Sequence, residues 1–451
     1  MVSFGTAGIR GDIEKTVTPA VALAVGRALS TMTETVVIGR DCRLSSPALT
    51  HAIEAGALSG GSKIVNVGQV PTPALAWASR DCVGVMITAS HNPASDNGIK
   101  LFIEGEEFDR ARERLIESAI AKDVPPVKWH GWQERRRKHI LDEYRQFLLS
   151  YLAPFGDDPG EMVVGIDCGN GVGGLVTPPL LSDMGVSVKS FNVAPDGRFP
   201  ARSSKPTARS LAVFADCIAD SDIELGLAHD GDADRLVVLD DRGEIVHEDT
   251  ILAIIAHHYV TQSDVSKPIV ITTPNASARV DERVSEAGGR VERTRLGGLH
   301  EGIAEAHENN RGSVVFAAEP WKHIHPMLGG WIDGIASAGL IVRLIAASGS
   351  LSTLREPISE RPYKKVSVRC ADEHKRTVLE LLTERLQVEF PDSTVDTSYG
   401  LRLSWPDGSW VLLRPSGTEP KFRIYLEAPT LEPRLSDIIA IVEEAVAEAS
   451  C

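Results

Sequence analysis

Three short segments of this 451-residue chain carry side chains that could do chemistry. In the first, residues 86–93, Ser90 follows an apolar run and directly precedes His91. We expect a strand over 83–88 that cannot continue through Pro93, because proline has no N–H to donate. The Ser90 hydroxyl would then lie on a loop at the carboxyl end of a strand, where open α/β sheets place their chemistry. A serine that only caps a helix is the alternative.

The second segment places Asp230, Asp232 and Asp234 at alternate positions between two apolar runs that are typical of strands. Isolated charges are costly to bury. Three carboxylates that converge from one loop, however, suit a hard cation such as Mg²⁺, which keeps positions for water or phosphate. A calcium EF-hand needs glycine at the sixth position, where this chain has Arg235. We therefore expect a metal site, with a solvated acidic turn as the alternative.

The third segment is Arg-Pro-Ser-Gly-Thr-Glu-Pro-Lys at residues 414–421. Gly417 lets the backbone approach a ligand closely. The hydroxyls of Ser416 and Thr418, with consecutive N–H groups, can hold phosphate oxygens. Arg414 can grip the same phosphate with its planar guanidinium group. A hairpin turn between two strands is the alternative.

The composition limits the partners that the chain can have. A formal net charge of −15 argues against general affinity for nucleic acid or for an anionic membrane. An anionic substrate would therefore need a local group of positive side chains, for which the candidates are Arg10, His91, Lys100, Arg235, His323, Arg414 and Lys421. The six cysteines lack CxxC or zinc spacing, which favours reduced thiols in a cytoplasmic protein.

The elements that must position these residues alternate between short apolar runs and helix-like stretches, which predicts parallel βαβ units. We expect three similar α/β domains with mixed, mainly parallel sheets and a C-terminal α+β domain. Their predicted bounds are 1–150 (serine loop), 151–249 (metal loop), 250–358 and 359–451 (phosphate loop). The glycines at 169–174 fit a strand-to-helix turn better than a dinucleotide loop. The basic run 135–138 is expected on a solvated helix face.

Together the three segments resemble the α-D-phosphohexomutase superfamily, which includes phosphoglucomutase, phosphomannomutase and phosphoglucosamine mutase. The resemblance runs nearly end to end, and five motifs occur in the family's order: residues 4–11, 88–93, 97–100, 230–235 and 414–420. It implies a phosphoryl group carried on Ser90 and one Mg²⁺ per chain. The implied ligands of that ion are Asp230, Asp232, Asp234 and Ser90.

The resemblance also implies roles for other residues. Arg10 would reach the active site, and His91 and Lys100 would be candidates for proton transfer. Lysine can serve there only if its pKa is lowered, so a phosphate clamp is the alternative for Lys100. The residues implied to bind a hexose phosphate are Arg235, Glu319, His323, Arg414, Ser416, Gly417 and Thr418. The chain could form a homodimer.

One family motif is altered in this chain. The sugar-binding loop usually has the pattern Gly-Glu-x-Ser-Gly-His, whereas residues 318–323 are Ala-Glu-Pro-Trp-Lys-His. Glu319 and His323 are at the expected positions, but Trp321 and Lys322 replace serine and glycine. This pattern is closer to archaeal members, and we expect a phosphoglucosamine mutase. Phosphomannomutase, phosphoglucomutase, a metal-dependent phosphatase and a non-catalytic sugar-phosphate-binding protein are the alternatives.

Overall fold

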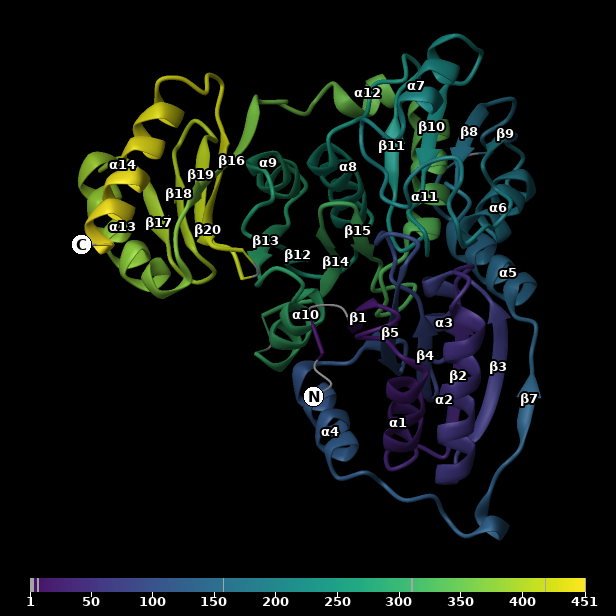
Figure 1. The fold of residues 1–451 in the computed structure, drawn as a ribbon. Coiled ribbons are helices and arrows are strands. Elements are labelled where there is room, and N and C mark those ends of the chain that lie inside the picture. The colour runs from purple at the N-terminus through teal and green to yellow at the C-terminus, as the bar shows by residue number, and fades with distance from the viewer. Residues whose placement is uncertain (1–3, 6–7, 157, 310, 418, 451) are drawn as a thin grey trace. The chain divides into compact units, whose positions relative to one another are not determined.

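A computed structural model of the chain describes all residues except 1–3, 6–7, 157, 310, 418 and 451. The described residues form two compact units. Unit 1 comprises residues 1–251 and 316–355, and unit 2 comprises residues 252–315 and 356–451. Figure 1 traces the elements of both units along the chain.

Residues 9–137 of unit 1 build a seven-stranded mixed sheet. Its strands are β1 (Ile9–Asp12), β2 (Thr35–Arg40), β3 (Lys63–Gln69), β4 (Val83–Ile87), β5 (Asp96–Ile103), β6 (Glu106–Glu107) and β7 (Arg135–Arg137). Its helices are α1 (Pro19–Leu29), α2 (Ser46–Gly60), α3 (Thr72–Ala78) and α4 (Arg110–Ala121), with a 3₁₀ turn η1 (Trp129–Gly131). The strand order is β1-β5-β4-β2-β3-β7, with β6 on β5. Strands β4, β2, β3 and β7 run parallel, whereas β5 is antiparallel to its neighbours.

The strand β7 corrects one prediction. The sequence predicts a solvated helix face at 135–138, but Arg135–Arg137 form an exposed edge strand that pairs in parallel with β3. Charged side chains are common on edge strands because they discourage pairing with another chain. The local pattern could not show this, since the partner strand lies far earlier in the sequence.

Residues 141–239 contribute a second sheet to unit 1. Its elements are α5 (Leu141–Leu152), β8 (Val163–Asp167), η2 (Val172–Leu175), α6 (Thr177–Asp183), β9 (Ser187–Phe191), α7 (Ala212–Ala219), β10 (Leu225–Ala228) and β11 (Val237–Leu239). The strand order is β11-β10-β8-β9, and only β11 is antiparallel to its neighbour. The acidic segment around Asp232 therefore connects β10 to β11 at the carboxyl end of β10. The glycine run after β8 leads into η2 and α6, as predicted.

The third part of the chain also alternates helices and strands. Its elements are α8 (Glu248–Thr261), β12 (Ile269–Thr272), α9 (Ala278–Glu286), β13 (Arg290–Arg293), α10 (Leu299–Glu308), β14 (Val314–Glu319), β15 (Lys322–Ile324), α11 (Gly334–Ser348) and α12 (Leu351–Arg355). Strands β12 and β13 of unit 2 are parallel. Strands β14 and β15 form an antiparallel hairpin, which carries the altered sugar-binding motif.

A buried carboxylate joins three of these segments within unit 1. Asp333 caps α11 by accepting from the N–H groups of Ile335 (3.0 Å) and Ala336 (2.8 Å). Its other oxygen accepts from the Tyr144 hydroxyl (2.6 Å) and from the Trp331 indole (2.9 Å). Because the Tyr144 ring of α5 also packs on Trp77 of α3, this network ties α3 to α5 and α11.

The C-terminal part of unit 2 is an antiparallel sheet with two long helices. Its elements are β16 (Tyr363–Arg369), η3 (Asp372–His374), α13 (Lys375–Glu389), β17 (Thr394–Asp396), β18 (Leu401–Ser404), β19 (Trp410–Pro415), β20 (Lys421–Glu427) and α14 (Arg434–Ala449). The strand order is β16-β20-β19-β18-β17. Apolar residues of α13 and α14 form its core with one face of the sheet.

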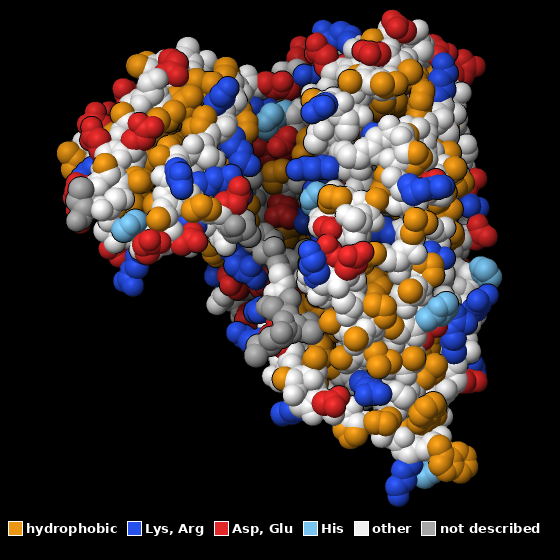
Figure 2. All heavy atoms as spheres, viewed as in Figure 1, with side chains coloured by type: hydrophobic (Ala, Val, Ile, Leu, Met, Phe, Trp, Pro, Cys, Tyr) orange, Lys and Arg blue, Asp and Glu red, His pale blue; other side chains and the backbone are white. Residues whose placement is uncertain are grey.

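This architecture confirms the predicted fold class of three α/β domains followed by a C-terminal α+β domain. On the face drawn in Figure 2, basic and acidic side chains are interspersed over the surface. Within the described residues, none of the helices has the length and apolar character needed to cross a membrane.

Candidate active site

Ser90 lies on a tight loop after β4, with its backbone in the left-handed region (φ +52°). That conformation costs a residue with a side chain of order 1–3 kcal/mol, so the surroundings must hold it in place. The Ser90 N–H donates to the hydroxyl of Thr88 (2.9 Å). The buried Ser90 hydroxyl donates to Asp230 Oδ2 (2.6 Å). The loop therefore directs this hydroxyl at the acidic segment of the second sheet.

The guanidinium of Arg43, fully buried, holds the serine loop in its conformation. It donates to four carbonyl oxygens of that loop. These belong to Ser90 (2.9 Å), Asn92 (2.8 Å), Pro93 and Asp96 (2.9 Å). Its Nε also pairs with the buried carboxylate of Asp41 (3.0 Å). One side chain from the loop after β2 thus donates to four carbonyl oxygens around the turn at Ser90, two of which also accept from Ser204 and from the Asp96 N–H.

The three aspartates of the acidic loop are buried and converge. One oxygen from each of Asp230, Asp232 and Asp234 lies within 4.8 Å of the others. Thr72, at the start of α3, donates its hydroxyl to Asp232 Oδ2 (2.6 Å). The loop approaches the serine loop through backbone atoms, because a Cβ at Gly231 would lie only 2.5 Å from the Ser90 carbonyl oxygen. Glycine is required at that position.

The buried ammonium of Lys100, on β5, lies between two of these carboxylates. Its Nζ donates to Asp232 Oδ2 (2.9 Å) and to Asp234 Oδ2 (2.9 Å). Burial by itself lowers the pKa of Lys100, but the two carboxylates outweigh it and raise that pKa above its ordinary value. In this arrangement Lys100 is a fixed positive charge. That favours the clamp alternative, because proton transfer would require a lowered pKa.

The acidic loop fits a metal ion. Burial, together with the negative charges of Asp234 and Asp232, raises the pKa of Asp230 well above its ordinary value. The positive charge of Lys100 therefore does not fully offset the charge of the three aspartates. Two further oxygens, Oδ1 of Asp232 and Oδ1 of Asp234, are buried without a hydrogen-bond partner among the described residues. An all-oxygen donor set of this kind suits a hard divalent cation.

Two arginines add positive charge beside this loop. Arg235 Nε lies 3.8 Å from Asp230 Oδ2 and 3.8 Å from Asp234 Oδ1.

His91 lies beside the same arginines. Burial is the largest cause that lowers the pKa of His91, and the charges of Arg235 and Arg10 lower it further, to about 3. The prediction that His91 adds positive charge is therefore wrong for this state of the site. Its neutral ring remains close to the serine, with Nδ1 3.3 Å from the Ser90 Oγ.

The altered sugar motif lies at the turn of the β14–β15 hairpin, and an isolated β-bridge joins it to the acidic loop at Arg235 and Lys322. The Lys322 Nζ pairs with Glu319 Oε1 (3.1 Å). Trp321 occupies the turn with φ +67°, and its carbonyl accepts from the Leu236 N–H (3.2 Å). Lys322, one of the two residues that depart from the motif, therefore pairs with Glu319, the carboxylate of the motif.

The structure does not bring His323 into this group. Its side chain is buried, its Nδ1 lies 2.9 Å from the Ser337 hydroxyl, and its ring packs near Phe316. Burial lowers the pKa of His323 to about 3, so the prediction that it adds positive charge is wrong. The reason is strand alternation: Lys322 and His323 are consecutive residues of β15 and point to opposite faces.

The loop at 414–421 belongs to unit 2 and connects β19 to β20, so the hairpin predicted as the alternative is present. The Ser416 N–H donates to the Lys421 carbonyl (2.9 Å), and Gly417 has open space around its Cα. Lys375 donates to the carbonyl oxygens of Ser416 and Glu419. Thr418 lies outside the described residues. A hairpin does not exclude phosphate binding, since Arg414 has no hydrogen bond or ion pair to another described side chain.

Three residues around the site were not predicted from the sequence: Arg43, Thr72 and Lys375. For Arg43 a signal existed, because two charged residues, Asp41 and Arg43, follow directly after an apolar strand. For Thr72 and Lys375 no local signal existed, since their partners lie far away in the sequence.

We expect Arg43→Met to destabilise unit 1. Removing one partner of a buried ion pair leaves Asp41 and the loop carbonyls uncompensated, which costs about 3–5 kcal/mol. The melting temperature should fall, and amide hydrogens of residues 89–96 should exchange faster than in the parent protein. Arg114→Met is the matched control, because Arg114 is exposed on α4 and has no hydrogen bond or ion pair with another described residue. Equal melting temperatures for Arg43→Met and the parent would contradict this role.

Four models of one family match the chain in order. They are described as phosphoglucomutase/phosphomannomutase α/β/α domain I (residues 1–125), domain II (142–243), domain III (247–361) and the C-terminal domain (366–445). A solved phosphoglucomutase/phosphomannomutase family protein from Burkholderia thailandensis has the same fold. It has a TM-score of 0.86 at 23% identity and covers 100% of this chain and 98% of that chain.

Archaeal relatives cover nearly the whole chain, in agreement with the predicted likeness to archaeal members. A phosphopentomutase of Thermococcus kodakarensis is 39% identical, with 98% of this chain and 99% of that protein covered. A probable phosphoglucosamine mutase of Methanopyrus kandleri is 38% identical, with 95% and 94% covered. With a serine beside a buried carboxylate triad and four family domains in order, the chain belongs to the phosphoglucomutase/phosphomannomutase family of phosphosugar mutases.

Proposed function

We propose that this chain isomerises a sugar phosphate by passing a phosphoryl group through Ser90. The observation that carries the proposal is the 2.6 Å contact of the Ser90 hydroxyl with Asp230, inside a cluster of three carboxylates and three cations. The first step starts from a phosphorylated Ser90: the bond from phosphorus to the Ser90 Oγ breaks, a bond to a free sugar hydroxyl forms, and the proton of that hydroxyl ends on the Ser90 Oγ. In the second step the other phosphate of the bisphosphorylated sugar passes to the Ser90 Oγ, and the serine proton ends on the sugar oxygen that is released.

We assign the metal as one Mg²⁺ held by Asp230, Asp232 and Asp234, with Ser90 beside them. When bound, it would offset the charge of the phosphoryl group, which is where phosphoryl transfer needs stabilisation. Lys100 and Arg235 hold the aspartates in place, Arg10 adds positive charge for the substrate, and the neutral ring of His91 is available to move a proton.

In unit 2, we propose that Arg414, Ser416 and Gly417 hold the phosphate that is not reacting, with Thr418 as the remaining motif residue. The cationic side chain of Lys375, fixed to the same hairpin, supports this role. We also propose that the functional division follows the four predicted domains, with bounds near 150, 249 and 358. A homodimer and a cytoplasmic location remain predictions.

For the sugar, glucosamine phosphate is the first candidate. Several archaeal relatives at 35–38% identity have the name probable phosphoglucosamine mutase. Glu319 would accept hydrogen bonds from ring hydroxyls and could also attract an amino group. His323 belongs to the family's sugar motif, and its buried side chain would act only by supporting the hairpin.

A pentose phosphate is the second candidate, and one contact favours a neutral sugar of this kind over an amino sugar. The ammonium of Lys322 pairs with Glu319 at 3.1 Å, so it competes for that carboxylate and repels a cationic amino sugar. A neutral sugar would not meet this repulsion. The Thermococcus kodakarensis relative named phosphopentomutase is consistent with this candidate.

The first test concerns Ser90. Intact-protein mass should show partial addition of one phosphate, and Ser90→Ala should lose both the added mass and at least about a thousandfold in turnover. Ser95→Ala, an exposed serine of the same loop, is the control and should keep both. A Ser90→Ala variant with parental turnover would rule out the covalent route. A parent protein that binds sugar phosphates without turnover would indicate a binding protein instead.

The second prediction concerns the metal. Mg²⁺ titrated into the protein by calorimetry should bind at one site per chain, and Asp232→Asn should weaken that binding at least about tenfold because it removes one charged ligand. Glu244→Gln, an exposed acid in the turn after β11, should bind like the parent. Unchanged turnover in excess chelator would contradict the assignment.

The third prediction tests whether Lys322 sets the choice between an amino sugar and a neutral sugar. The kcat/KM values for glucosamine 1-phosphate, glucose 1-phosphate, mannose 1-phosphate and ribose 1-phosphate should be measured for the parent and for Lys322→Met. Removing the ammonium should raise the ratio for glucosamine over glucose by about five- to tenfold, the effect of one charge repulsion near a half-buried site. A ratio that does not change would show that Lys322 plays no part in sugar choice.

A further inference from the structure

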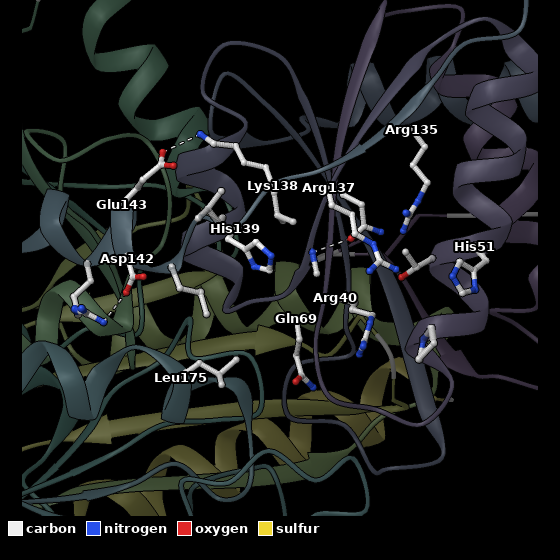
Figure 3. Close-up of a pocket in the computed structure, with 18 residues that line it drawn as sticks. Arg40, His51, Gln69, Arg135, Arg137, Lys138, His139, Asp142, Glu143 and Leu175 are labelled. Carbon is white, nitrogen blue, oxygen red and sulfur yellow. Dashed lines mark hydrogen bonds and ion pairs between the residues drawn. The ribbon is translucent and has the colours of Figure 1, made fainter.

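A second cavity in unit 1 is separate from the Ser90 site. It has a volume of about 850 Å³, and none of its lining residues belongs to the Ser90 cluster. Its walls come from the carboxyl ends of β2 and β3, from the strand β7 and the residues after it, and from the N-terminal turns of α2 and α5. Figure 3 shows the side chains around it.

Three parallel strands end at this cavity. Strand β3 lies between β2 and β7 and is parallel to both. Arg40, Gln69 and Arg137 are the last residues of these three strands, so they meet at one edge of the sheet. The carboxyl edge of parallel strands is where open α/β sheets bind ligands. The cavity therefore lies where a ligand site is expected in such a sheet. One of the three strands that form it, β7, was not predicted from the sequence.

The cavity is basic in a protein with a net charge of −15. Three of its five lysine and arginine side chains have carboxylate partners: Arg135 with Glu54 (2.7 Å), Lys138 with Glu143 (2.8 Å) and Arg145 with Asp142 (3.0 Å). Arg40 and Arg137 have none among the described residues. Both side chains line this cavity, and Figure 3 draws them to the left of His51. A bound anion would supply the counter-charge that both guanidinium groups lack.

Part of the lining is apolar. Val67, Ile140, Leu141 and Leu175 belong to it, and Figure 3 shows the ring of His139 to the left of Arg40 and Arg137. Volumes of 300–1,000 Å³ with a few convergent polar groups are usual for small-molecule sites. We propose that this cavity binds a small organic phosphate of nucleotide size, with its phosphate at Arg40 and Arg137 and its ring near His139.

Two strand ends connect this cavity to the serine and acidic loops. Arg40 is followed by Asp41 and then by Arg43, which holds the Ser90 loop. Gln69 is followed closely by Thr72, which donates to Asp232. The proposed site therefore borders the supports of the catalytic residues, although it shares none of the residues that hold the substrate.

The test is calorimetric titration of the full chain with adenosine 5′-monophosphate, with excess substrate sugar phosphate present to fill the Ser90 site. We expect one nucleotide bound per chain. Arg137→Gln and Arg40→Gln should each weaken binding at least about tenfold, the effect of losing one charge-assisted hydrogen bond. The control is Arg136→Gln. It removes the same charge from the same strand, but Arg136 points away from the cavity and pairs with Glu134. It should bind like the parent.

Several results would overturn the proposal. The first is that the parent protein does not bind the nucleotide at millimolar concentration. The second is that the Arg136 and Arg137 variants lose nucleotide affinity equally. The third is that the sugar phosphate displaces the nucleotide completely. If inorganic phosphate bound as tightly as the nucleotide, the apolar lining would contribute nothing to binding. The proposal of an organic phosphate as the ligand would then be wrong. Arg137 is exposed on an edge strand, so its variant should fold even if Arg40→Gln does not; a parental melting temperature checks this.

Discussion

The site depends on how unit 1 keeps three carboxylates together away from water. Burying one uncompensated charge costs several kcal/mol, and three at close range repel one another as well. Lys100 offsets part of this charge through Asp232 and Asp234, and Arg235 lies beside Asp230. The remaining negative charge makes the loop suited to a hard cation. The same imbalance explains why basic side chains gather there in an acidic protein.

The geometry of the proposed catalytic site is set by backbone contacts as much as by side chains. The serine loop comes from the first sheet and the acidic loop from the second, and they touch where Gly231 meets the Ser90 carbonyl. The strained turn at Ser90 persists because Arg43 satisfies its carbonyl oxygens. Phosphoryl transfer is mostly a matter of positioning and charge. A rigid meeting point of two sheets is a structure that can supply both.

Much of this could be predicted from the sequence, and what could not has a physical cause. Strands could be predicted from apolar runs with polar ends, and the acidic loop from the alternating aspartates, because both are local patterns. The edge strand β7 was missed because its pairing depends on a distant partner. The positive charge expected of His91 and His323 was wrong because burial, which a sequence does not display, lowers the pKa of both rings. The contact of Lys322 with Glu319 likewise needed the hairpin geometry.

The close approach at Gly231 has a consequence for how this protein can diverge or be recombined. The serine loop and the acidic loop are in direct contact, although about 140 residues separate them in the sequence. A substitution in one loop that alters the contact therefore requires a compensating change in the other. A chimaera that joins the first sheet of one relative to the second sheet of another would keep both motifs but would have to form this contact anew. The two residues that depart from the sugar motif, Trp321 and Lys322, belong instead to the β14–β15 hairpin, so a change at the proposed sugar-binding loop need not alter the contact at Gly231.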